Sequence, residues 1–216
     1  MTPDKIWSSF YKKIKPEYKT AFFGTFIIGL LAHLYAITNN FLTFDSMWNI
    51  YSDQDMITSG RQFLTYACSV GSYYDLPLIN GLLAILYLSF AAVVIVSAFN
   101  IEGKVLPVIA GGLLVTFPSV SSTFAYTYTI DGYMLAVLLA CLAYLLSRNL
   151  KYGFIAGIFA LGLSIGIYQA EFSFTILLCI FGLMLDILNG EKTKELLKKA
   201  LKFFVIGIGV YAFYII

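Results

Sequence analysis

Long apolar runs alternate with short polar intervals along almost the whole chain. A helix of about 20 mostly apolar residues crosses the roughly 30 Å hydrocarbon core of a bilayer. By that measure the pattern predicts seven membrane-spanning helices, expected at 20–41, 76–99, 105–126, 132–146, 153–168, 172–188 and 201–216. The sequence therefore predicts an all-α polytopic membrane protein.

One polar interval is much longer than the others. Residues 44–76 separate the first two spans and contain four aspartates but a single cation, Arg61. The same interval holds large apolar side chains such as Met47, Trp48 and Phe63, which are typical of short helices folded onto a membrane surface. We therefore expect a structured loop with a pocket.

Composition and charge agree with this topology. Of the 216 residues, 60% are hydrophobic and only 12% are charged, too apolar a balance for an ordinary soluble domain. Lysine and arginine accumulate on the cytoplasmic side of membrane proteins. A cytoplasmic N-terminus places 13 of the 14 basic residues inside with six acids, net +7, and leaves Arg61 with six acids outside, net −5. The 44–76 loop is therefore expected on the extracytoplasmic side.

The two ends of the chain differ in character. Residues 1–19 place Ile6, Trp7 and Phe10 between lysines at helical spacing, which predicts a helix lying in the cytoplasmic interface ahead of a transmembrane domain at 20–216. No small-residue cleavage site follows, so this is not a cleavable signal. At the other end the apolar run reaches Ile216 without a polar flank, and we expect further sequence beyond it.

Several residues within the spans carry predictions of their own. His33, the single histidine, has no acidic neighbour at helical spacing and is expected to be a packed, hydrogen-bonded core residue. Pro118 should kink or end the third span. The small residues between Gly153 and Gly166 favour close packing of the fifth span on its neighbours. The three cysteines indicate no disulfide framework.

Polar groups also gather at two later turns. The fifth span ends in Tyr168-Gln169-Ala170-Glu171, and the apolar run resumes at once, so a tight hairpin should hold Gln169 and Glu171 at the level of the long loop. A hydroxyl-rich segment near Asp131 contains Tyr126, Tyr128 and Tyr133. These tyrosines either stack on a sugar or, as the sequence favours, form an interfacial aromatic belt.

Acids and one arginine outside the membrane, beside helices that can hold a lipid tail, suit chemistry on a lipid-linked polar substrate. A carboxylate can act as general base and an arginine can hold a phosphate leaving group through paired hydrogen bonds, and neither step needs ATP. The candidate bases are Asp45, Asp53 and Asp55, and the candidate substrate-binding residues are Arg61, Asp131, Tyr168, Gln169 and Glu171. The three aspartates also offer oxygen ligands for a divalent cation. No motif specifies a metal site, and we expect no cofactor.

Four short motifs carry a resemblance to a known family. They are Ser59-Gly60-Arg61 in the long loop, Leu76-Pro77 opening the second span, Phe117-Pro118 in the third, and Ile167-Tyr168-Gln169-Ala170 closing the fifth. In this order they resemble the N-terminal half of the serotype-converting, Gtr-type membrane glucosyltransferases of the GT-C superfamily. The resemblance covers most of the chain, from about residue 40 to residue 174.

This resemblance implies a function. Such enzymes transfer a sugar, often glucose, from undecaprenyl phosphate to a cell-surface polysaccharide such as O-antigen, on the outer face of the bacterial cytoplasmic membrane. A carboxylate in the first outer loop is the base of the inverting reaction, and motif order makes Asp45 its counterpart. Many members similar to this chain have two adjacent acids there, whereas Ser46 follows Asp45, so a share for Asp53 or Asp55 stays open.

The expected partners follow from that reaction. They are the polyprenyl-phosphate sugar, the polysaccharide acceptor, membrane lipids, and a flippase and a donor synthase, with no nucleic acid. The alternative is a non-enzymatic flippase or assembly partner for lipid-linked sugars. A transporter concentrates polar groups near the bilayer midplane, whereas the polar groups of this chain lie mainly at the expected outer surface.

Overall fold

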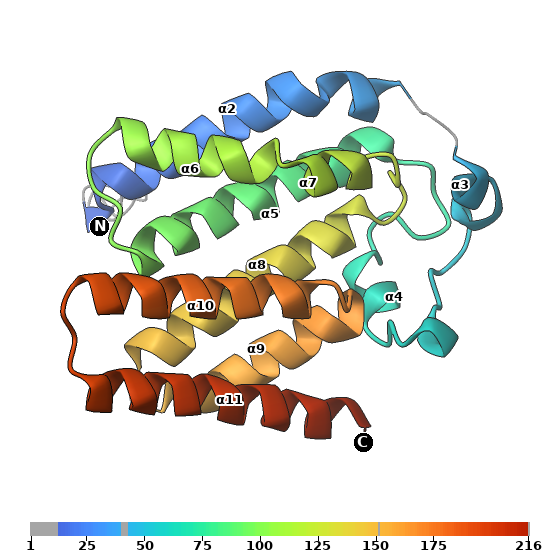
Figure 1. The fold of residues 1–216 in the computed structure, drawn as a ribbon. Coiled ribbons are helices and arrows are strands. Elements are labelled where there is room, and N and C mark those ends of the chain that lie inside the picture. The colour runs from blue at the N-terminus through green and yellow to red at the C-terminus, as the bar shows by residue number, and fades with distance from the viewer. Residues whose placement is uncertain (1–12, 40–42, 151, 216) are drawn as a thin grey trace, which may run out of the picture.

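The long helices run alternately in opposite directions between the two ends of the bundle (Figure 1). The computed structural model describes residues 13–39, 43–150 and 152–215. The longest helices are α2 (Pro16–Thr38), α5 (Pro77–Ala98), α8 (Ile130–Asn149), α10 (Glu171–Leu188) and α11 (Thr193–Ile215), and the shorter apolar ones are α6 (Val105–Val115) and α9 (Gly153–Ile167). Apart from one isolated bridge between Met56 and Arg61, the described residues form no β-structure. The all-α prediction is confirmed.

Helix length supports only part of the predicted span count. Among the described residues, four helices are long and apolar enough to cross a membrane, namely α2, α5, α8 and α10. Helices α6 and α9 are shorter, and α11 begins with a run of lysines and glutamates. The structure therefore supports a membrane protein without confirming the count of seven.

Two helix boundaries differ from the predicted ones. The basic segment after residue 190 was expected to precede a separate span at 201–216, but α11 is continuous from Thr193 because lysine and glutamate are good helix formers. Similarly, α2 starts at Pro16, a residue suited to the first helical turn, so residues 16–19 belong to it. Residues 1–12 of the predicted interfacial helix lie outside the described residues.

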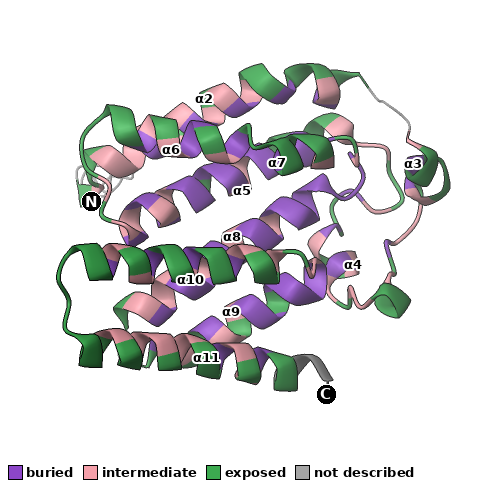
Figure 2. Ribbon diagram, viewed as in Figure 1, coloured by how far each residue is buried: buried purple, intermediate pink, exposed green. Residues whose placement is uncertain are grey.

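Helix α8 lies at the centre of the packed helices. Its buried side chains include Ile130, Met134 and Tyr144, and it packs against α5, α9 and α10 (Figure 2). By contrast, α2 and α10 expose large apolar side chains such as Leu31 and Leu177. Apolar exposure on the outer helices of a bundle is expected where lipid, and not water, covers the protein.

Small residues bring α9 close to α8. A Cβ atom on Gly157 would overlap the Ser147 hydroxyl, so a larger residue at this crossing would have to displace that side chain. Two turns further along, the Ser164 hydroxyl donates a 2.7 Å hydrogen bond to the carbonyl of Ala136 across the same interface. The predicted close packing of the fifth span is confirmed.

The third predicted span is broken where Pro118 lies. Helix α6 ends at Val115, and α7 (Pro118–Thr123) begins with the proline. His33 of α2 makes a 2.8 Å hydrogen bond from Nε2 to the Val115 carbonyl and stacks on Phe124 with ring centroids 3.7 Å apart. Since a carbonyl only accepts, Nε2 carries the proton. His33 is therefore a packed, hydrogen-bonded core residue, as the sequence predicted, and its hydrogen bond also caps the end of α6.

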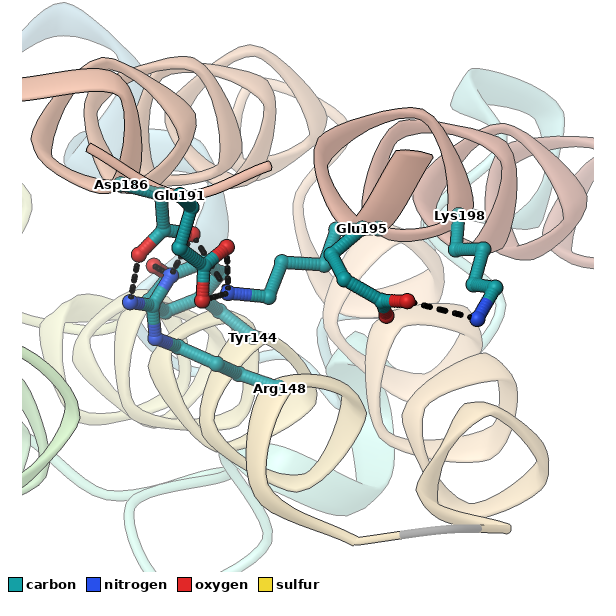
Figure 3. Close-up of polar contacts among 7 residues, drawn as sticks. Tyr144, Arg148, Asp186, Glu191, Glu195 and Lys198 are labelled. Atoms are coloured by element: carbon teal, nitrogen blue, oxygen red, sulfur yellow. Dashed lines mark hydrogen bonds and ion pairs between the residues drawn. The ribbon is translucent and has the colours of Figure 1, made fainter. Parts of the chain in front are cut away.

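Charged groups gather at the end of the bundle opposite the long loop. Asp186 of α10 accepts two hydrogen bonds from Arg148 of α8, at 2.6 and 3.1 Å, and one of 2.9 Å from Lys199 of α11. Glu191 also accepts from Lys199 (Figure 3). This network, absent from the sequence-based predictions, ties the ends of three helices together.

Candidate functional site

A cavity of about 1000 Å³ lies at the end of the bundle that carries the long loop. Loop 44–76 closes one side of it with α3 (Phe44–Asn49) and with the turn that follows the one-turn helix η1 (Ile57–Ser59). The other walls come from α6, α7, α8 and α10, from the residues just before α8, and from Ile95 of α5. Four predicted site residues line this cavity, which are Asp45, Arg61, Tyr168 and Glu171.

Asp45 reaches the cavity from the first turn of α3. Thr43 caps this helix, since its hydroxyl accepts a 3.2 Å hydrogen bond from the Ser46 backbone. One turn later Asn49 donates to the Asp45 carbonyl at 2.9 Å and lines the same cavity. The Asp45 side chain is exposed, so its carboxylate is accessible to a substrate that enters the cavity.

Arg61 is placed by a tight turn and by contacts with two helices. Gly60 has φ of +74°, a left-handed conformation that favours glycine, and the Arg61 backbone returns to Met56 through a 3.1 Å hydrogen bond. Its guanidinium donates to the Tyr133 hydroxyl at 2.9 Å. Among the described residues it forms no ion pair with a carboxylate. A partly buried cation of this kind is suited to an anionic ligand.

The turn between α9 and α10 holds the loop in place. Gln169 donates a 2.7 Å hydrogen bond to the carbonyl of Ser59, which lies two residues before Arg61. The Phe63 backbone donates to Gly166 at 2.8 Å, and the Phe63 ring occupies the space that a side chain on Gly166 would fill. Glu171, the first residue of α10, directs its partly buried side chain to the cavity. The predicted hairpin therefore contacts the long loop.

The remaining candidate acids lie away from the cavity. Asp53 accepts a hydrogen bond from the Asp55 backbone at 3.2 Å in an exposed turn, and neither residue lines the cavity wall. Asp131 is buried in the first turn of α8, where its Oδ1 has no hydrogen-bond partner among the described residues. The structure thus separates Asp45 from the other aspartates, which the sequence left open.

Tyrosines that were expected in an aromatic belt line the cavity. Tyr128 and Tyr133 are buried, so the belt prediction is wrong for these two. Burial, then the neighbouring Tyr133 phenol and the Asp45 carboxylate, raise the pKa of Tyr128 to about 12, while Arg61 acts in the opposite direction. Tyr128 is therefore close enough to interact electrostatically with both Asp45 and Arg61. The hydroxyl-rich segment that precedes α8 was the sequence signal for this polar wall.

The cavity continues as an apolar groove along the helices. Ile95 lies near the far end of α5 and Phe181 in the second half of α10, so the groove extends well beyond the polar end. Leu113 of α6 and Leu177 of α10 line it and are also 66% and 63% exposed. The groove therefore opens between α6 and α10 on a surface that is itself apolar.

The second cavity of the described structure has few polar groups that could bind or transform a substrate. This cavity of about 490 Å³ between α8, α9, α10 and α11 has almost wholly apolar walls. Among the described residues, no group of three or more His, Cys, Asp or Glu side chains is arranged to hold a metal ion. The groups that can perform polar chemistry are thus concentrated in the loop-end cavity.

The fold and the cavity define a helical membrane protein whose polar site adjoins an exposed apolar groove. A family model described as Glucosyl transferase GtrII matches residues 34–216. The chain belongs to this glucosyltransferase family, which confirms the resemblance drawn from the motifs. No curated protein and no solved structure matches the chain. Family membership indicates a membrane glycosyltransferase.

Proposed function

We propose that the protein transfers a sugar, glucose by family analogy, from a polyprenyl-phosphate carrier to a cell-surface polysaccharide. The observation that carries the proposal is the combination of Asp45, Arg61 and Glu171 in one cavity with an apolar groove that opens between α6 and α10. A lipid-linked sugar needs both parts, since its head is polar and its tail apolar. The donor phosphate and sugar would occupy the polar end, and the first isoprene units the groove.

In this mechanism Asp45 is the general base. Its carboxylate takes the proton of an acceptor hydroxyl while that oxygen bonds to the anomeric carbon of the sugar. The bond from this carbon to the phosphate oxygen breaks on the opposite face, so configuration inverts. The leaving polyprenyl phosphate carries the resulting negative charge, and Arg61 stabilises it through charge-assisted hydrogen bonds.

The other polar groups bind the substrate. Glu171 and Tyr168 line the side of the cavity formed by the hairpin. There the Glu171 carboxylate can accept hydrogen bonds from sugar hydroxyls, and the Tyr168 hydroxyl can donate to them. Gln169 acts indirectly, through its bond to the Ser59 carbonyl. Asp53, Asp55 and Asp131 have no direct role in this proposal because they lie outside the cavity.

The orientation in the membrane is part of the proposal. Lys104, Arg148 and the lysines at the start of α11 lie at the end of the bundle opposite the loop, which the positive-inside rule assigns to the cytoplasm. The cavity would then face the extracytoplasmic side. We propose seven passes, with α6 and α7 together forming the third and α9 the fifth, in the bacterial cytoplasmic membrane.

A transfer assay tests the function directly. Membranes containing the full-length protein are incubated with polyprenyl-phosphate [¹⁴C]glucose and purified polysaccharide, and label is followed into polymer. Incorporation that depends on the protein supports the transferase. Label that crosses the bilayer without entering polymer would instead support a flippase and overturn the proposal.

A further inference from the structure

Two tyrosines, one in α8 and one just after α9, contact the guanidinium of Arg61. Tyr133 lies in the first turn of α8 and Tyr168 directly follows α9. Their rings stack with centroids 4.5 Å apart, and the Arg61 Cζ atom lies 5.6 Å from the first centroid and 5.2 Å from the second. A guanidinium at this distance from an aromatic face is attracted by the negative charge of the ring face.

Among the described residues, the side-chain hydrogen bonds of Arg61 use only one of its three guanidinium nitrogens. Nη1 donates to the Tyr133 hydroxyl at 2.9 Å and to the Met56 sulfur at 3.4 Å. An arginine has five N–H donors, two of them on each terminal nitrogen. With both Nη1 hydrogens engaged, the parallel donors of Nε and Nη2 remain to bind a ligand. This edge matches the spacing of two oxygens on one phosphate.

The tyrosines also immobilise a side chain that would otherwise sample many rotamers. Arg61 belongs to a loop, whereas Tyr133 is 7% exposed and fixed within the most buried helix of the bundle. An arginine that is already ordered loses less conformational entropy on binding a ligand. The orientation of Arg61 is therefore determined largely by the packing of α8 and α9.

We propose that Tyr133 is a positioning residue, which holds Arg61 so that its Nε and Nη2 edge faces the phosphate of the lipid-linked donor. This inference rests on the proposed function and deepens it. Tyr168 contributes its ring to the same arrangement. A lysine at position 61 would not replace the arginine, because an ammonium group has no planar pair of donors.

A double-mutant cycle tests this role in the transfer assay. Tyr133→Phe removes the hydroxyl and keeps the ring, so we expect kcat/KM for the donor to fall about ten- to a hundredfold, the usual scale for one hydrogen bond to a charged group. In an Arg61→Ala background the same substitution should have no further effect. Product inhibition should weaken in parallel, with a higher Ki for added polyprenyl phosphate. Tyr74→Phe, at an exposed loop position, is the matched control and should retain full activity.

Two further results distinguish a failure of the positioning role of Tyr133 from a failure of the Arg61 contact with phosphate. Tyr168→Leu removes the second ring but leaves the hydrogen bond of Tyr133, and it should also lose its effect when Arg61 is absent. If the tyrosine and arginine effects simply multiply, or if Tyr133→Phe leaves kcat/KM and Ki unchanged, the positioning role is wrong while the transferase remains. Full activity of Arg61→Ala would instead overturn the phosphate contact on which the inference rests.

Discussion

Gln169 donates a hydrogen bond to the backbone carbonyl of Ser59 at 2.7 Å, across 110 residues of sequence. This bond fastens the turn between α9 and α10 to the part of the long loop that carries Arg61. Two segments that each supply cavity residues are thereby held in fixed relation.

Gln169→Leu should loosen the loop without unfolding the bundle. Loss of one hydrogen bond costs about 1 kcal/mol, so we expect faster cleavage of loop 44–76 in limited proteolysis and a severalfold loss of transfer. The control is Gln62→Leu, an exposed position in the same loop. Equal proteolysis rates for the two variants would show that the Gln169 contact does not hold the loop.

His33→Leu should destabilise the protein although the new side chain is apolar. The Val115 carbonyl would lose the partner that satisfies it at the end of α6, and a buried unsatisfied acceptor costs roughly 1–3 kcal/mol. Thermal unfolding in detergent should show a lower Tm, and His33→Gln, which keeps a donor, should recover part of the loss. A Leu variant as stable as the parent would contradict the capping role.

Asp186→Asn should be one of the more damaging single substitutions. It leaves Arg148 and Lys199 without their shared carboxylate, and breaking a buried ion pair costs about 3–5 kcal/mol. Because Arg148 and Lys199 remain 18% and 29% exposed, we expect a smaller loss of about 2 kcal/mol. Glu195→Gln breaks the exposed Lys198 pair and serves as control, with an expected change below about 0.5 kcal/mol. Similar Tm values for both variants would refute the helix-tying role.

Cys68 should resist thiol reagents in the folded protein. Burial, and then the nearby charge of Asp131, raise the pKa of the Cys68 thiol well above its ordinary value, so the reactive thiolate is scarce. In a variant with Cys141 and Cys179 replaced by alanine, maleimide labelling at pH 8 should stay negligible until the protein is unfolded. The raised pKa also means that Cys68 supports folding below its ordinary pKa and loses this contribution as pH rises further. Rapid labelling of the native protein would contradict the buried position.

The sequence was sufficient to predict the helices and the ends at which polar groups gather. The length of the apolar runs located the long helices without fixing the number of spans, and Pro118 marked the break between α6 and α7 because proline cannot continue a helix. The sequence did not show that the basic residues 193–200 form one helix with the apolar residues that follow. Their charge and the length of the apolar run gave opposite indications. The positions of the helices and the break at Pro118 were predictable because each depends on residues close together in the sequence.

The candidate site was predictable only in part. Asp45, Arg61 and Glu171 were correctly expected near one another because topology brings alternate turns to the same end of a bundle. Asp53 could not be separated from Asp45, since a loop has no periodicity that tells which side chain faces inward. The contact between Arg61 and Tyr133 spans 72 residues and depends on helix packing, which no local pattern encodes.

The transfer rate of Asp45→Asn tests the central proposal most directly. Asparagine keeps the size of the side chain but cannot accept a proton, so we predict a loss of transfer of about 10²–10⁴-fold with unchanged expression and membrane insertion. Asp53→Asn and Asp55→Asn, outside the cavity, are matched controls and should remain active. Full transfer activity of Asp45→Asn would contradict the assignment of Asp45 as the general base.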